Sequence, residues 1–157
     1  MPDNPWTVRT LRSALETAPD RRAEEMSVRV VEGADPILLV TMCEYGDLEI
    51  FVSVGEQQIA ASVLLWPVDE QPDRHAFNEF LLKAQKIVPL SNFGISTVGE
   101  RDYYELFGEL ATTTPLDTIL IELRTLAENA IEAASDLRSS FQPSGPPAGA
   151  PGAQPAA

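Results

Sequence analysis

The fold is decided by residues 48–67, which read LEIFVSVGEQQIAASVLLWP. Apolar side chains alternate with other residues from Leu48 to Val54 and again from Ile59 to Leu65, as in strands that bury one face. The intervening Gly55-Glu56-Gln57 is short, whereas a crossover between parallel strands needs a dozen or more residues. This stretch therefore predicts two neighbouring antiparallel strands.

Similar patterns on both sides extend the predicted sheet. Strands at Ser27–Val31 and Ile37–Met42 precede the quoted stretch, and their short connections make an antiparallel meander with it. A further pair of strands is predicted at Asn92–Val98 and Tyr103–Leu110, around a turn that contains Gly99.

Helices are predicted before, between and after these strands. The first covers Pro5–Ala18, with Thr7 as its N-cap, and the second opens at Asp73 and stops at Pro89. Helices that lie on one face of an antiparallel sheet form a two-layer α+β domain, which is the fold class that we expect.

The last helix has the clearest pattern of the three. Thr114 is predicted to cap it, with Pro115 at the first helical position. Apolar residues recur at helical spacing from Leu116 to Leu137 and form the stripe that faces the core. We assign four acidic residues to the outer face of this helix: Glu122, Glu128, Glu132 and Asp136.

The domain is expected to occupy residues 1–141. Residues 142–157 contain only Pro, Gly, Ala, Ser and Gln, and so offer little apolar surface to offset the entropy of ordering. We therefore predict that this tail is disordered.

The net charge of −13 limits the classes of partner. An acidic surface repels the phosphate backbone of nucleic acids and an anionic lipid leaflet, so we expect no nucleic acid partner. Apolar runs such as Ile59–Val68 are too short to span a bilayer, and residues 1–11 lack the pattern of a signal peptide, so no membrane insertion is expected. The expected location is the cytoplasm.

No catalytic, cofactor or metal site is predicted. His75 is the only histidine, and Cys43, the only cysteine, falls in an apolar run where a buried and inert thiol is expected. The carboxylates Asp69, Glu70 and Asp73 lack the spacing of a calcium loop, and we expect them to be solvated. The sequence therefore favours a protein that is not an enzyme and needs no cofactor.

Two features qualify as partner-binding candidates. Trp66 closes the longest predicted strand, and tryptophan is enriched at binding hot spots, although packing beneath the second helix is the favoured interpretation. The second feature is the set of acidic residues on the last helix. A solvated outer face is the default interpretation, and a surface complementary to a basic partner is the alternative.

Four segments carry a resemblance to a known family: SVLLWP at 62–67, RHAFNEFLLK at 74–83, VPLSNFGI at 88–95 and DYYELFG at 102–108. With these words in this order, the chain resembles the YjfI-like family of uncharacterised bacterial proteins over roughly Trp6–Leu137. The family is a domain of unknown function, so the resemblance supplies no catalytic residues.

The element order is also similar to the type III secretion chaperone-like fold, whose members commonly dimerise and bind partner proteins. Gene neighbourhood associates the family with membrane-stress proteins of the phage-shock type. The resemblance thus implies a chaperone-like or adaptor module that binds a protein partner, is a homodimer and is linked to envelope stress. The alternative is a small-ligand-binding protein or an enzyme with a carboxylate-lined pocket.

Overall fold

The computed structural model describes residues 4–18 and 25–138. These residues form a six-stranded sheet of order β1-β2-β3-β4-β6-β5, in which all neighbouring strands are antiparallel. The strands are β1 (Met26–Val31), β2 (Ile37–Met42), β3 (Leu48–Val54), β4 (Gln58–Pro67), β5 (Asn92–Val98) and β6 (Arg101–Ala111). The helices are α1 (Val8–Thr17), α2 (Arg74–Ala84) and α3 (Leu116–Glu132), and α3 continues into a π-helical segment, Ala133–Leu137.

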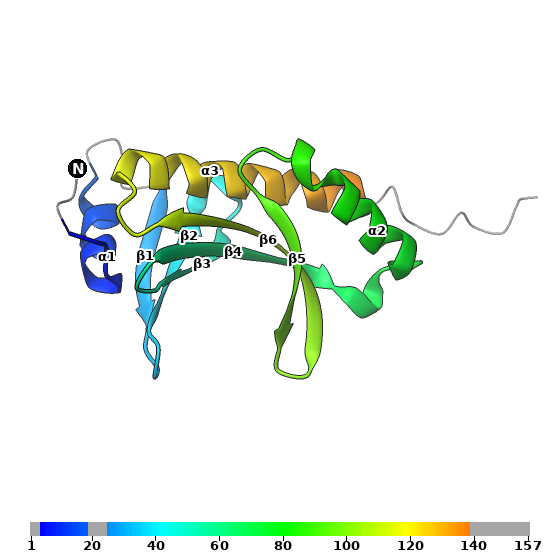
Figure 1. Ribbon diagram of the computed structural model, residues 1–157, viewed down its shortest axis with the longest axis horizontal. Coiled ribbons are helices and arrows are strands. Elements are labelled where there is room, and N and C mark those ends of the chain that lie inside the picture. The colour runs from blue at the N-terminus through cyan, green and yellow to red at the C-terminus, as the bar shows by residue number, and fades with distance from the viewer. Residues whose placement is uncertain (1–3, 19–24, 139–157) are drawn as a thin grey trace, which may run out of the picture.

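The elements form two layers (Figure 1). Helix α3 runs along one face of the sheet, α1 lies beside β1 at one end, and α2 lies at the other end. This arrangement confirms the predicted α+β fold class, and the meander from β1 to β4 confirms the antiparallel order expected from residues 48–67.

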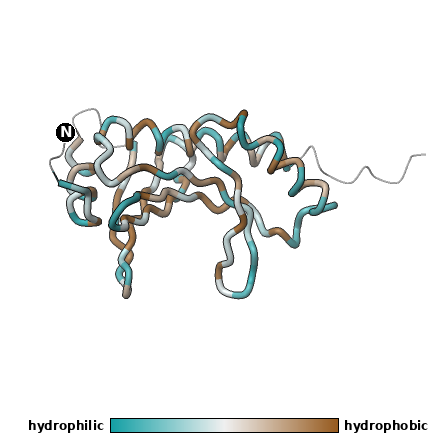
Figure 2. The backbone as a smooth tube through the Cα atoms, viewed as in Figure 1, coloured by the Kyte–Doolittle hydropathy of each residue, from teal (hydrophilic) through white to brown (hydrophobic). Residues whose placement is uncertain are grey.

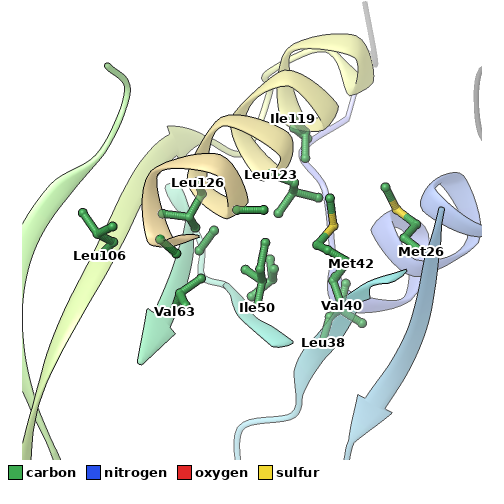
Figure 3. Close-up of a cluster of buried hydrophobic side chains, with 14 of the residues drawn as sticks. Met26, Leu38, Val40, Met42, Ile50, Val63, Leu106, Ile119, Leu123 and Leu126 are labelled. Atoms are coloured by element: carbon green, nitrogen blue, oxygen red, sulfur yellow. The ribbon is translucent and has the colours of Figure 1, made fainter. Parts of the chain in front are cut away.

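The core lies between α3 and the sheet (Figure 3). Ile119, Leu123 and Leu126 of α3 are buried against sheet residues such as Ile50 and Val63. Truncating such a fully buried leucine to alanine costs about 2–5 kcal/mol, so this stripe fixes α3 on the sheet. The predicted apolar stripe is confirmed over this part of the helix.

Helix α1 begins later than predicted. Thr7 is its N-cap, as expected, and accepts a hydrogen bond from the backbone N–H of Thr10 at 3.2 Å. Trp6, just before the cap, is not part of the helix, and its indole N–H donates to the backbone oxygen of Thr114 at 2.8 Å. This bond fastens the beginning of the described chain to the β6–α3 connection.

The predicted cap of α3 is wrong. Pro115 occupies the N-cap position, and no side chain accepts a capping hydrogen bond there, so Thr114 does not cap the helix. The backbone oxygen of Thr114 instead accepts the Trp6 bond.

The expected burial of Cys43 is also wrong. Strand β2 ends at Met42, and Cys43 starts a 3₁₀ turn with an exposed thiol. The turn is tight because Gly46 and Asp47 follow in the left-handed region, at φ values of 69° and 58°. The strand therefore ends one residue before the apolar run does.

Candidate protein-docking surface

Large apolar side chains are exposed around α2 and β5. Leu82 and Ile87 are 72% and 80% exposed, and Leu90 and Ile95 are 57% and 49% exposed. We call these four residues the α2–β5 surface. Figure 2 shows that hydrophobic segments occur in α2 as well as in the strands of the core.

Three adjoining hollows make this surface continuous. The first has a volume of about 290 Å³, and Leu82 and Ile95 line it from the two sides. Phe93 lines this hollow and a second one with Ile87, while Gln85 lines the first hollow and a third one with Leu90. The exposed apolar residues therefore surround connected depressions, which is a feature of interaction sites rather than of scattered surface residues.

Strand β5 forms an edge of the sheet, since β6 is its only neighbour in the strand order. At Phe93 the outer edge is closed by Gln85, whose side-chain amide donates to the Phe93 carbonyl at 2.7 Å and accepts from the Phe93 N–H at 2.6 Å. Backbone groups alternate in direction along an antiparallel strand, so those of Ile95 and Thr97 also point away from β6. These two residues offer an open edge beside the α2–β5 surface.

The sequence of β5 lacks the usual protection of an edge. Natural proteins place charges, proline or bulges on exposed edges, or cover them, because such edges pair with other chains. Strand β5 reads NFGISTV and contains neither a charge nor a proline. The opposite edge, β1, carries Arg29 and lies against α1.

An aromatic cluster holds α2 in its place next to the sheet. The ring centroids of Trp66 and Phe77 are 5.9 Å apart, and those of Phe77 and Tyr104 are 5.0 Å apart. The indole N–H of Trp66 donates to Gln71 Oε1 at 2.9 Å, and the Tyr104 hydroxyl bonds to Asn78 Oδ1 at 2.6 Å. Each polar end in the cluster thus has a partner.

Trp66 is only 3% exposed. Its interpretation as a residue packed beneath the second helix is confirmed, and its predicted role in partner binding stays a prediction. The indole ring is therefore not part of the exposed α2–β5 surface, and it supports α2 from beneath.

The four acidic candidates of the last helix do not lie together. Glu132 and Asp136 line the hollow that also contains Ile87, so they form an acidic rim on the α2–β5 surface. Glu128 lies on another side and accepts a 3.0 Å hydrogen bond from the Tyr45 hydroxyl. Burial and this bond raise the pKa of Tyr45.

The outer-face assignment of Glu122 is wrong, because this side chain is 5% exposed. Its carboxylate lies over Gly108 of β6, where any Cβ atom would overlap Glu122 Oε1. Burial raises the pKa of the Glu122 carboxyl. Sequence reasoning missed two signals: Glu122 stands three residues after Ile119 and four before Leu126, and an isolated glycine interrupts a strand pattern at Gly108.

The acidic loop after β4 is occupied by ion pairs. Arg101 reaches Asp69 at 2.7 Å and Glu70 at 3.2 Å, and Arg138 reaches Glu70 at 3.2 Å. The hydrogen bond from Arg101 lowers the pKa of Asp69. The Arg138 guanidinium also lies 5.7 Å from the Trp66 ring centre, in the range of a cation–π contact.

The described residues contain no group of three or more His, Cys, Asp or Glu side chains able to hold a metal ion. His75 and Cys43 are both exposed and lie on different elements. In the same part of the chain, no helix is long and apolar enough to cross a membrane.

Fold and surface together define a two-layer α+β domain with one open sheet edge and an apolar surface beside it. The chain belongs to the family described as "Uncharacterized protein conserved in bacteria (DUF2170)", which matches residues 5–141. It is 34% identical over 129 residues to the "Uncharacterized protein YjfI" of Escherichia coli strain K12, an alignment that covers 82% of this chain and 92% of that protein. The protein of the same name from Escherichia coli O157:H7 matches equally, so the family resemblance stated from the sequence is confirmed.

Among solved structures, the chain is similar to one in "Crystal Structure of the ExsC-ExsE Complex". The TM-score is 0.47 at 12% sequence identity, and the superposition covers 83% of this chain and 93% of that chain.

Proposed function

We propose that this protein is a cytoplasmic, non-enzymatic adaptor or chaperone-like module that binds an extended segment of a partner protein on the α2–β5 surface. The observation that carries the proposal is the open, uncharged edge of β5 beside connected apolar hollows. Main-chain hydrogen bonds to such an edge give affinity, and side-chain pockets next to it give specificity.

The contact between Gln85 and Phe93 supports this mode of binding. The side-chain amide of Gln85 makes two short hydrogen bonds to the outer edge of β5, in the manner of a peptide group in a neighbouring strand. A partner segment would continue this pairing at Ile95 and Thr97, with its apolar side chains against Leu82 and Ile95.

The charges around the surface favour a partner segment that also carries basic residues. Glu132 and Asp136 lie at the hollow with Ile87, and the whole chain has a net charge of −13. Such a field raises the rate of encounter with a basic surface, and salt screens it beyond a Debye length of about 8–10 Å. A partner from a phage-shock-type stress system is the proposal that the family resemblance adds.

A homodimer is the second proposal for the same edge. Two antiparallel edge strands can pair across a twofold axis with identical contacts on both copies, and β5 has no charge to prevent this. In that assembly the partner segment would retain the apolar hollows but lose the strand edge.

Photo-cross-linking in the native host tests both proposals. Benzoylphenylalanine is introduced at Leu82 or Ile95, with Ser27 on the opposite edge strand as the matched control, because it is exposed on β1. We expect discrete adducts from the first two positions and none from Ser27. Mass spectrometry then distinguishes a second copy of the chain from another protein.

A binding measurement with the purified protein and its purified partner completes the test. Once the cross-linked partner is identified, Leu82→Asp should abolish its binding without changing the melting temperature by more than a degree or two, because this side chain is exposed. Adducts of equal yield at all three positions, or full binding by Leu82→Asp, would remove the basis for the proposal.

A further inference from the structure

Glu122 is a buried carboxylate without a hydrogen bond or ion pair in the part of the chain that the structure describes. The other buried polar side chains there all have partners: Gln71 bonds to Trp66, Ser91 to Asn129, and Thr112 to the Glu56 carbonyl. An unpaired ionised carboxylate is costly to bury, so such groups are found paired or bound to a ligand. Glu122 is therefore the exception that needs an explanation.

The carboxylate faces a cavity of about 340 Å³ between α3, β6 and the loop before β5. Glu109 and Leu90 line the same cavity, and no lysine or arginine is among its lining residues. The Leu90 carbonyl lies close to the carboxylate above Gly108, since both approach the position that a Cβ atom would occupy there. The Glu122 carboxylate and the Leu90 carbonyl are thus two acceptor groups that lie close together.

Two amide donors near this cavity already have acceptors. The Gln85 amide nitrogen donates to the Phe93 carbonyl, and the Asn129 amide nitrogen donates to the Pro89 carbonyl at 2.8 Å and to Ser91 Oγ at 2.9 Å. The second pair of bonds fixes the loop that contains Leu90, whose φ is 55°. The loop wall of the cavity at Leu90 is therefore anchored, and the charged residues that line the cavity, Glu122 and Glu109, are both acidic.

We propose that this cavity binds a guanidinium or primary ammonium group, with the Glu122 carboxylate as its counterion. Such groups have several N–H donors and a positive charge, and so match the Glu122 carboxylate and the Leu90 carbonyl. Gly108 is essential to the site, because only glycine leaves room for the carboxylate above β6. This cavity is the third hollow beside the α2–β5 surface, but the proposal rests on Glu122 and does not require a partner segment to bind there.

The group can come from a free guanidino or amino compound or from an arginine or lysine side chain of a protein. The first experiment uses the shared chemistry. Methylguanidinium and methylammonium chloride are titrated into the full chain and followed by amide and Glu122 Cδ NMR shifts, with tetramethylammonium chloride as the matched cation without N–H donors.

We expect saturable shifts near Leu90 and Glu109, a lowered apparent pKa of Glu122, and at least tenfold weaker binding in Glu122→Gln. The control Glu100→Gln, in the exposed β5–β6 turn, should bind like the parent chain. In the parent chain, a pH titration of the Glu122 Cδ shift with and without the cation tests the same contact, because binding should lower the apparent pKa of Glu122. No saturation by either N–H cation, or equal binding of tetramethylammonium, would overturn the proposal.

A second arm identifies the source of the group. Agmatine is compared with the blocked tripeptide acetyl-Val-Arg-Val-amide, in the parent chain and in Leu82→Asp. Tighter binding of the tripeptide that Leu82→Asp reduces assigns the site to a protein side chain, whereas tighter binding of agmatine assigns it to a free compound. Methylguanidinium binding should be unchanged in Leu82→Asp, so failure of the docking proposal does not affect this one.

Discussion

The close approach of Glu122 to Gly108 predicts a strong coupling between the two positions. A Cβ atom at Gly108 would overlap Glu122 Oε1, lie 2.9 Å from its Cδ and 3.2 Å from the Leu90 carbonyl oxygen. The glycines with positive φ are Gly46 and Gly99, so alanine at position 108 has no backbone penalty. Its cost is steric, and overpacking of this kind costs about 1–3 kcal/mol.

Removing the carboxylate should remove most of this cost. Of the three atoms nearest to the new methyl group, Glu122→Ala removes two and leaves the Leu90 carbonyl oxygen, which needs to move by a few tenths of an ångström. Alanine also gains about 0.5–1 kcal/mol over glycine inside a strand. We therefore expect Gly108→Ala to be close to neutral in the Glu122→Ala background, with a coupling free energy of at least about 1 kcal/mol.

The coupling is measured by urea unfolding of the parent chain, Gly108→Ala, Glu122→Ala and the double variant, followed by the fluorescence of buried Trp66. The free energies are compared only where the m values agree. Gly94→Ala on β5 is the matched control, because its Cβ atom would approach Glu105 and Phe107 rather than Glu122. The effects of Gly94→Ala and Glu122→Ala should add within about 0.5 kcal/mol. Additivity of the Gly108→Ala and Glu122→Ala effects would refute the placement of the carboxylate.

Three further predictions concern Glu122, Gln85 and the tail. Burial raises the pKa of Glu122 above its ordinary value of 4.5, so the folded state holds a proton that the unfolded chain releases. The free energy of unfolding of the parent chain should therefore fall, relative to that of Glu122→Gln, as pH rises above 4.5. Urea melts that give parallel pH profiles for the two chains would contradict this. Gln85→Ala leaves the partly buried Phe93 N–H and C=O without their bonds and should cost about 1–3 kcal/mol, whereas the exposed Lys86→Ala should cost less than about 0.5 kcal/mol in the same assay. Deleting residues 142–157 should change the free energy of unfolding by less than about 1 kcal/mol. In the full chain, amide exchange should find these residues unprotected.

The sheet was predictable because alternation and turn residues are local signals. Residues 48–67 give both strands and their antiparallel pairing, and the observed bounds of β3 and β4 differ from the prediction only at the ends of β4. The caps at Thr7 and Asp73 were equally accessible, since both follow from a side chain that accepts a bond within its own first turn.

The burial of Glu122 depends on a contact between distant parts of the chain. Its position between Ile119 and Leu126 places it on the inner face of α3, but a glutamate there is tolerated only because the residue opposite is Gly108. That opposition is set by the position at which α3 packs across β6. Helical periodicity contains no information on where α3 packs on the sheet, so it predicts a solvent-exposed position for a charged residue in the stripe.

The open edge follows from the order in which the last two strands join the sheet. A predicted pair of strands leaves open which member lies next to β4, and the structure places β6 there. The reverse order would have put at the edge a strand that carries Arg101, Asp102, Glu105 and Glu109, all of which discourage pairing with another chain. Helix α2 makes the observed order possible, since it carries the chain from the end of β4 past one strand position to β5. The charged strand therefore lies inside the sheet and the uncharged one at its edge. The isolated chain therefore lacks charged residues that would keep β5 from pairing with other chains, and the proposed partner would cover this edge.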